Sequence, residues 1–447
     1  MTPYSEADAP DSDGVETESL KRVFGLTTLV IYGVGDILGA GIYAVVGKIA
    51  GLSGTMVWAS FLCAMLVAAL TALSYAELGS RLPKSGGVAY FIHSAFRNEW
   101  LSMLVGWLMF CTCLVSMATL SIAFSGYLNA FAPVLPTWAI VIALFAGLAF
   151  VNFRGMKESS ALNIFCTTLE VSGLIIVILV SASFLLSGNS TAAAPPVPGA
   201  AVGINAILQG AALAFYAFIG FEDIVNVAEE VKNPERNVPR AILLALAIAG
   251  VIYVLVSWLA TQVMSPAELS ASGAPLLDVV KRAQPNFPPL VFTVIALFAV
   301  LNTALLNFVT ASRLLFGMSR EGLLPAWLGK LHPERLTPHR TFLVILPIAI
   351  LLALSGTLQF LAGTTATLIM AMFCLVNLSL LVIKRREPQV EGFQIPVPIP
   401  ALALGSNLIL IAFASQASHL LALAFTVIGL LLIWMHKAIS GKQRSAI

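Results

Sequence analysis

Charged residues are scarce in this chain. Asp, Glu, Lys and Arg make up 10% of its 447 residues, whereas a soluble globular domain carries about 25%. Hydrophobic residues account for 59%. This composition excludes a soluble globular protein, because too little charge is present to cover a water-exposed surface, and it indicates that lipid surrounds most of the chain. The net charge of +2 gives no indication of a nucleic-acid partner.

The sequence also lacks the signatures of catalysis, metal binding and nucleotide binding. The five histidines show no metal-ligand spacing, and there is no phosphate loop or catalytic triad. We therefore expect neither an enzyme, nor a cofactor, nor ATP-driven transport by this chain alone. The five cysteines form no Cys-x-x-Cys pair and all lie in apolar runs, so we interpret them as small core residues: Cys63, Cys111, Cys113, Cys166 and Cys374.

Long apolar segments dominate the rest of the chain. A helix needs about 20 apolar residues to cross a bilayer. No charged residue occurs in residues 100–153, 171–221, 341–383 or 392–436, and clusters of Pro, Gly and Ser divide these stretches. We predict an all-α membrane protein with twelve transmembrane helices, at residues 24–50, 55–79, 99–126, 137–153, 158–186, 203–230, 239–263, 288–318, 341–357, 361–383, 397–415 and 418–436.

The distribution of basic residues supports this count and gives an orientation. If both termini are cytoplasmic, 21 of the 24 Lys and Arg residues fall in cytoplasmic segments, and only Lys48, Lys281 and Arg282 fall outside. Cytoplasmic loops of membrane proteins carry such an excess. If one span were missed or added, every later loop would change sides of the membrane, and the asymmetry would disappear from that point on. We expect a multi-pass protein of the cell (inner) membrane with both termini in the cytoplasm.

Two spans carry residues that an uninterrupted helix would not favour. Span one contains Gly39-Ala40-Gly41 near its middle, where paired glycines favour unwinding; close helix packing is the alternative reading. Span six contains Gly220, followed at once by Glu222 and Asp223. Two acids inside a continuous span would be costly, whereas the start of a new half-helix stabilises negative charge. We therefore predict a break near residues 217–220.

Interrupted spans in corresponding positions are a sequence sign of a transporter built from an inverted repeat. Spans one and six are five apart, which predicts a 5+5 repeat with two extra helices. Repeat one would cover residues 23–186, repeat two 203–384 and the extra spans 397–437. The polar, acidic residues 1–22 lack the basic region of a signal peptide. We expect them to form a disordered cytoplasmic tail, and residues 438–447 to form a second tail.

The two breaks also predict a binding chemistry. The half-helix that starts near Gly41 offers free N–H groups, which suit a carboxylate. The half-helix that ends near Phe218 offers free carbonyls, which suit an ammonium group. A site with both matches the zwitterionic part of an amino acid, and spans 3, 8 and 10 would line the space for its side chain.

Five motifs resemble those of the amino acid–polyamine–organocation (APC) family of permeases. They lie at residues 39–43, 75–87, 215–222, 228–242 and 312–325. The resemblance implies a leucine-transporter-type fold, alternating access, and an amino acid or amine substrate. By motif match it also implies that Ile37, Gly39, Ala40 and Gly41 receive the carboxylate, and that Ala217, Phe218 and Ile219 receive the amine, with Phe218 as an aromatic lid.

Two further acids need an explanation. Glu170 lies about 18 Å from the cytoplasmic end of span five, near mid-membrane, where an unpaired ionised group costs several kcal/mol. Similar proton-coupled permeases often carry a lysine in this region, which is absent here. Glu170 is therefore either the proton-coupling group or a neutral hydrogen-bonded residue. Asp36, one turn before the first break, either faces the substrate, where it would favour a cation or carry a proton, or has a structural role.

Other polar residues have simpler interpretations. Glu222 and Asp223 are expected at a half-helix start, and Glu77 and Arg81 as a helix-end pair. Asn302, Asn307 and Thr310 are candidates to line the site. The sequence thus predicts an amino acid permease driven by protons or by exchange, with an amine or polyamine carrier, or a sensor without flux, as the alternatives.

Overall fold

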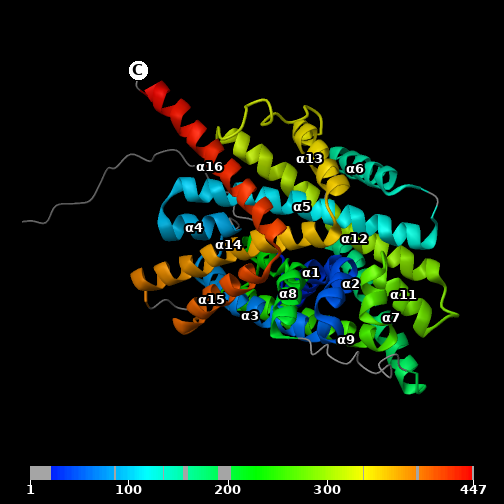
Figure 1. Ribbon diagram of the computed structural model, residues 1–447. Helices are drawn as coiled ribbons and strands as arrows, with labels where there is room; N and C mark the ends of the chain where they lie inside the picture. The colour runs from blue at the N-terminus through cyan, green and yellow to red at the C-terminus, as the bar shows by residue number, and fades with distance from the viewer. Residues whose placement is uncertain are drawn as a thin grey trace, which may run out of the picture.

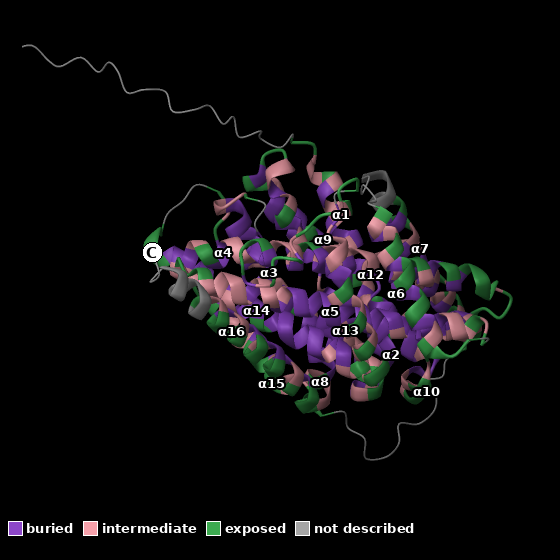
Figure 2. Cartoon of the chain, turned by 90° about the horizontal axis from the view of Figure 1, so that it is seen from above, coloured by how far each residue is buried: buried purple, intermediate pink, exposed green. Residues whose placement is uncertain are grey.

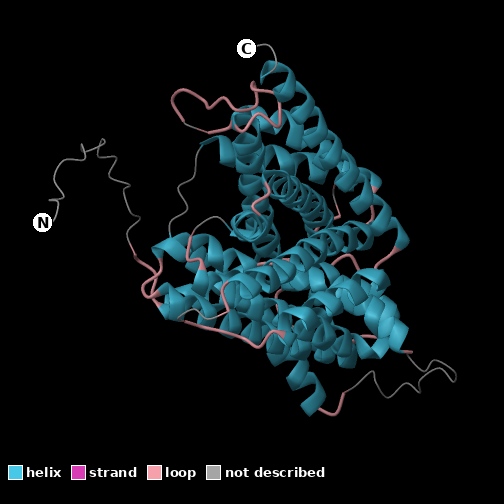
Figure 3. Ribbon diagram, turned by 90° about the vertical axis from the view of Figure 1, so that its left-hand side faces the viewer, coloured by secondary structure: helices cyan, strands magenta, loops and turns pink. Residues whose placement is uncertain are grey.

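The computed structural model describes residues 22–84, 87–133, 135–154, 160–189, 203–335, 337–388 and 392–444. Within these ranges the secondary structure is helical, apart from one isolated bridge between Phe24 and Val231. Figure 3 shows the described chain drawn as helices and connecting loops. The predicted all-α class is therefore confirmed. Residues 1–21 of the predicted N-terminal tail lie outside the described residues.

The described residues of the first half form eight α-helices and three 3-10 helices, and Figure 1 labels the α-helices. In chain order these are α1 (Leu26–Leu38), α2 (Gly41–Ser53), η1 (Gly54–Met56), α3 (Val57–Arg81), α4 (Gly87–Phe96), α5 (Glu99–Phe131), α6 (Thr137–Arg154), α7 (Ser160–Leu186), α8 (Ile204–Ala214), η3 (Phe215–Phe218) and η4 (Phe221–Glu230).

The second half continues with longer helices and a short pair between them. In chain order these are α9 (Pro234–Val263), α10 (Pro266–Ala271), α11 (Pro275–Ala283), α12 (Pro289–Arg320), η5 (His339–Thr341), α13 (Phe342–Ser355), α14 (Leu358–Arg386), α15 (Pro398–Phe413) and α16 (Gln416–Arg444). Helix α16 continues past residue 437, into residues 438–447, for which the sequence predicts a tail.

Nine helices in the described residues are long and apolar enough to cross a membrane. Four shorter apolar helices accompany them, and three of these fall on predicted spans: Leu26–Leu38, His339–Ser355 and Pro398–Phe413. These helices confirm the predicted all-α, multi-pass membrane protein. The nine are Gly41–Arg81, Glu99–Phe131, Thr137–Arg154, Phe165–Leu186, Ile204–Glu230, Pro234–Val263, Pro289–Arg320, Leu358–Arg386 and Gln416–Lys437.

Three short helices lie where no helix was predicted. Helix α4 has 10 residues, too few to span a bilayer. Helix α10 begins with a capping box, in which the side chains of Ser265 and Glu268 each bond the other's backbone N–H. Helix α11 follows after three residues and ends near Lys281 and Arg282. Such segments are missed by a search for long apolar runs.

The interrupted helices occupy the centre of the bundle. Helix α1 packs on α7 and α9, and α2 packs on α8 and α10, while the long helix α5 packs on α12 and α14. Figure 2 shows the buried residues concentrated in this central region, with exposed residues toward the periphery. Large apolar side chains remain exposed on α15 and α16, among them Leu402 and Trp434, as expected where lipid replaces water.

A buried ion network joins the ends of α3 and α14. Glu77 is 0% exposed, and its Oε1 accepts from Arg81 Nε at 2.8 Å and from Lys384 Nζ at 2.7 Å. Arg81 Nη2 lies 2.6 Å from the same oxygen. Its Oε2 accepts from the Ile395 N–H at 2.8 Å. The predicted pairing of Glu77 with Arg81 is confirmed, and Lys384 adds a second cation that sequence spacing did not suggest.

Candidate functional site

The first interruption lies at Gly39 and Ala40. Helix α1 ends at Leu38 and α2 begins at Gly41, as the paired glycines predicted. Side chains from distant helices hold the free backbone groups: the Ala40 N–H donates to Thr303 Oγ1 at 3.1 Å. The Tyr253 hydroxyl donates to the Ile37 carbonyl at 2.5 Å. The break is thus supported by α9 and α12 rather than left to solvent.

The second interruption lies at Ile219 and Gly220. The 3-10 turn η3 ends at Phe218, Ile219 is extended (ψ 137°), and Gly220 has φ +128° before η4 begins at Phe221. That φ is accessible to glycine and strained for other residues. The predicted break near residues 217–220 is therefore confirmed.

Each interruption packs against the other through its glycine. A Cβ added to Gly41 would lie 2.7 Å from the Ala217 Cα, and one added to Gly220 would lie 2.8 Å from the Asp36 carbonyl. No side chain fits at such distances. The outer ends also meet, because the Phe24 carbonyl accepts from the Lys232 N–H at 2.9 Å. Glycine is therefore required here for close backbone contact, beyond its effect on helix stability.

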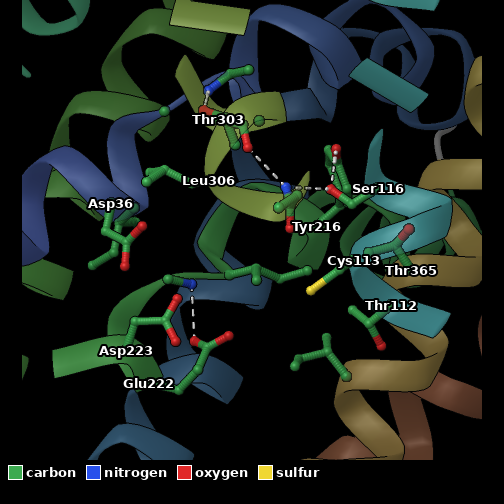
Figure 4. A pocket seen from close by; sticks show the side chains of 18 of the residues that line it. Asp36, Thr112, Cys113, Ser116, Tyr216, Glu222, Asp223, Thr303, Leu306 and Thr365 are labelled. Atoms are coloured by element: carbon green, nitrogen blue, oxygen red, sulfur yellow. Dashed lines mark hydrogen bonds between the residues drawn. The ribbon is translucent and has the colours of Figure 1, made fainter. Parts of the chain in front are cut away.

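A cavity of about 90 Å³ lies at this contact (Figure 4). One water molecule needs roughly 10–15 Å³ of cavity volume on the same measure, so the cavity can hold more than one water. Helices α5, α12 and α14 complete its wall, which corresponds to the predicted spans 3, 8 and 10. The lining residues are Asp36, Ile37, Gly39, Ala40, Gly41, Met109, Thr112, Cys113, Ser116, Tyr216, Ala217, Ile219, Gly220, Glu222, Asp223, Thr303, Leu306, Asn307, Thr310, Thr365 and Ile369.

Hydrogen bonds tie three elements together along one wall. Ser116 Oγ on α5 lies 3.2 Å from the Tyr216 hydroxyl on η3. The same Oγ accepts from Asn307 Nδ2 on α12 at 3.3 Å. These neutral donors and acceptors give the cavity a polar side without adding charge.

Three carboxyl groups gather on another side of the cavity, as Figure 4 shows. Glu222 Oε2 accepts from the Gly220 N–H at 2.9 Å, as expected for an acid at the start of a half-helix. Asp223 Oδ1 accepts from Asn226 Nδ2 at 2.8 Å. The Oδ2 atom of Asp36 is buried and receives no hydrogen bond from a donor in the described chain. No Lys, Arg or His is among the described lining residues.

The structure brings most of the predicted site residues together. The cavity is lined by Asp36, Ile37, Gly39, Ala40, Gly41, Ala217 and Ile219. Phe218 is not among the described lining residues. Its ring packs on Phe61 and Tyr253, with centroids 6.4 Å and 5.3 Å away. The role of Phe218 as a lid stays a prediction. In this conformation the aromatic side chain among the described lining residues is Tyr216.

Glu170 lies beside the cavity rather than in its wall. Its side chain on α7 is 1% exposed, and Oε1 accepts from Asn302 Nδ2 at 3.1 Å. The Tyr43 hydroxyl donates to the Glu170 backbone carbonyl at 2.8 Å. Oε2 has no hydrogen-bond partner in the described chain. Of the three polar candidates on α12, Asn307 and Thr310 line the cavity, and Asn302 instead binds Glu170.

The sequence of this chain is similar to those of known membrane transporters. A family model described as "Amino acid permease" matches residues 24–436. The branched-chain amino acid permease BcaP of Bacillus subtilis (strain 168) is 29% identical over 446 residues, covering 94% of each chain. The methylthioribose transporter of the same strain is 28% identical over 421 residues, covering 87% of this chain and 88% of its own.

A mammalian relative shows a similar degree of likeness. Cationic amino acid transporter 4 of Mus musculus is 30% identical over 403 residues, covering 85% of this chain and 62% of its own. The family and these relatives are transporters, which fits a protein that is not an enzyme. The chain therefore belongs to the amino acid permease family of the APC superfamily.

Proposed function

We propose that this protein is a secondary transporter that moves an amino acid across the cell membrane by alternating access. One observation carries the proposal: two interrupted helices face each other and jointly line a cavity at the centre of the bundle. Backbone that leaves helical geometry inside a membrane is tolerated where it lines a cavity or is buried in protein.

The backbone at the two breaks supports an amino acid substrate. The first N–H groups of α2 have no partner within the helix, and they carry the positive end of its dipole. The carbonyls at the end of η3 carry the opposite polarity. A substrate carboxylate near Gly41 and an ammonium group near Ala217 and Ile219 would satisfy both. The chain's similarity to amino acid permeases supports the same class.

The proposed architecture has twelve spans, with both termini in the cytoplasm. Spans one to five and six to ten would form two inverted repeats, and α15 and α16 would be the additional spans. Two facts support this arrangement: the interruptions fall in spans one and six, and each carries a glycine in backbone contact with the other.

Glu170 is one candidate for the proton-coupling group. Its Oε2 is buried without a partner, and Asn302 gives the carboxyl a single neutral donor. A proton on Oε2 would remove the cost of an unpaired charge. Transport by Glu170→Gln is expected to lose the pH dependence of the wild type. Unchanged pH dependence would remove Glu170 from the mechanism.

A second candidate function is transport of a cationic amino acid or an amine. The three carboxyl groups in the cavity wall favour it, as does the similarity to a cationic amino acid transporter. Glu170, however, does not line the cavity, so only one of the two acids expected to attract an amine, Asp36, faces it.

Counterflow in proteoliposomes tests the proposal. Vesicles loaded with unlabelled leucine, arginine or putrescine are diluted into trace amounts of the same labelled compound. Thermal-shift screening selects the compounds, because a ligand that binds only the folded protein raises its stability. We expect counterflow with at least one amino acid. Binding without counterflow would indicate a sensor, and counterflow with putrescine alone would indicate an amine carrier.

A further inference from the structure

Asp36 and Asp223 bring acidic side chains from the two interrupted spans together. Asp36 lies in the last turn of α1 and Asp223 in the first turn of η4. Both line the cavity, and Figure 4 shows them side by side. Ionised carboxylates are acceptors only. A hydrogen bond between these two groups therefore requires one proton.

No Lys, Arg or His among the described lining residues could replace that proton. The titratable groups of the described chain near enough to interact with one or both aspartates are Glu222 from η4, Glu170 from α7, Tyr75 from α3 and Cys113 from α5. All are acidic or neutral. Asn226 donates to Asp223, and no described donor reaches Asp36 Oδ2. Two like charges side by side in such surroundings are strongly unfavourable.

The position of the pair distinguishes it from Glu170. Glu170 contacts Asn302 and lies outside the cavity wall. The aspartate pair instead joins the two elements whose ends form the cavity, and Gly220 presses on the Asp36 backbone beside it. Any movement that separates α1 from η4 must also separate the two carboxyl groups. The protonation of the pair is thus linked to both substrate occupancy and conformation.

We propose that Asp36 and Asp223 share one proton in this conformation, and that this proton is the one carried with the substrate. The inference rests on the proposed transport function and names the aspartate pair, in place of Glu170, as its coupling site. The pair takes up one proton from the side to which the cavity opens. It releases the proton on the other side when α1 and η4 separate, so that substrate and proton move together without any covalent step.

The test uses the full-length protein in proteoliposomes, with a substrate identified by counterflow. Wild-type vesicles are expected to accumulate that substrate when the outside is made acidic, with acidification of the lumen reported by a trapped dye. Asp36→Asn and Asp223→Asn are expected to lose both acid-driven accumulation and lumen acidification, each measured relative to that variant's own counterflow. Glu321→Gln, at an exposed position after α12, is the matched control and is expected to behave as wild type.

Each other outcome is decisive. Asn variants that keep acid-driven accumulation, or a wild type with counterflow but no proton movement, would overturn the inference and leave transport intact. Absence of counterflow in the wild type with any amino acid or amine would defeat the proposed function itself. A preference for cationic substrates that disappears in Asp36→Asn, with proton flux unchanged, would assign the pair to the substrate instead and overturn the inference.

A loss of folding or counterflow in the Asn variants is resolved by Asp36→Glu, which keeps a titratable group. We expect this variant to retain proton movement with a shifted pH profile, in protein that elutes as a single species. Counterflow in Asp36→Glu without proton movement would contradict a shared proton.

Discussion

Glu77 and Asp36 are both carboxyl groups in the interior of a membrane protein, and the structure surrounds them in opposite ways. Both oxygens of Glu77 accept hydrogen bonds, and two cations, Arg81 and Lys384, lie within 2.7 Å. Asp36 lines a cavity whose described lining residues include no Lys, Arg or His, and one of its oxygens has no donor in the described chain. A fixed counter-ion makes an acid part of the scaffold, whereas its absence leaves room for a mobile cation.

The different surroundings of Glu77 and Asp36 correspond to their different places in the fold. The Glu77 network ties α3 to α14 and to the segment before α15, since Lys384 also donates to the Ile395 carbonyl at 2.7 Å. Removing one member of a buried ion pair leaves the other charge uncompensated. The cavity acids, in contrast, can become neutral by taking up a proton. The first set is therefore expected to govern stability and the second to govern transport.

The largest effect is expected for Glu77→Gln. This change leaves two buried cations with a neutral partner, and loss of one partner of a buried pair costs about 3–5 kcal/mol. We expect a large drop in the apparent unfolding temperature in detergent and little folded protein. The triple variant Glu77→Leu, Arg81→Leu, Lys384→Leu is the control and should recover part of the loss. A Glu77→Gln protein as stable as wild type would contradict a scaffold role.

The next effect is expected for Gly220→Ala. Alanine at φ +128° is strained by about 1–3 kcal/mol, and its Cβ would meet the Asp36 carbonyl at 2.8 Å. Because each 1.4 kcal/mol is about tenfold in an equilibrium, we expect counterflow to fall at least about tenfold. Gly147→Ala is the matched control, since its added Cβ meets no described atom within 4 Å. Equal activity in both variants would show that the contact between the breaks is dispensable.

A smaller effect is expected for Thr303→Val. The Ala40 N–H would lose its acceptor, and an unsatisfied buried group costs about 1–3 kcal/mol. We expect weaker substrate binding in a thermal-shift titration, with the unliganded protein folded. Thr303→Ser keeps the hydroxyl and should bind as wild type does. If both variants bind equally well, the hydroxyl does not support the first break.

The smallest effect is expected at the Glu268–Arg282 pair, where the side chains are 44% and 38% exposed. Hydrogen bonds from Arg282, and then from Ser265, lower the pKa of Glu268 from 4.5 to about 2. The pair therefore stabilises the fold fully above pH 4.5 and loses this contribution as the pH falls toward 2. Exposed pairs contribute less than about 1 kcal/mol.

This pair is tested by Glu268→Gln. We expect a slightly lower unfolding temperature than wild type at pH 7, and a difference that shrinks as the pH falls below 4.5. A difference that grew in acid would contradict the direction of the pKa shift.

The interruptions could be predicted from the sequence because they depend on local chemistry. Gly39 and Gly41 mark the first break, and Gly220 followed by two acids marks the second. Glu170 could be singled out for the same reason, because it is an isolated charged residue in a long apolar stretch of sequence.

The remaining features depend on distances along the chain that no local pattern spans. Lys384 is 307 residues from Glu77, and Asp223 meets Asp36 only because the two breaks pack together. Which ring of η3 faces the cavity also depends on the three-dimensional packing. The Phe218 ring packs on Phe61 and Tyr253, whereas Tyr216 lines the cavity.

The contacts of Gly41 and Gly220 have a consequence for how such a protein can diverge. A methyl group gained at position 41 would meet the Cα of residue 217, and one gained at position 220 would meet the carbonyl of residue 36. These are backbone atoms, so no substitution in the other half of the chain can make room. Homologues should therefore keep glycine at both positions.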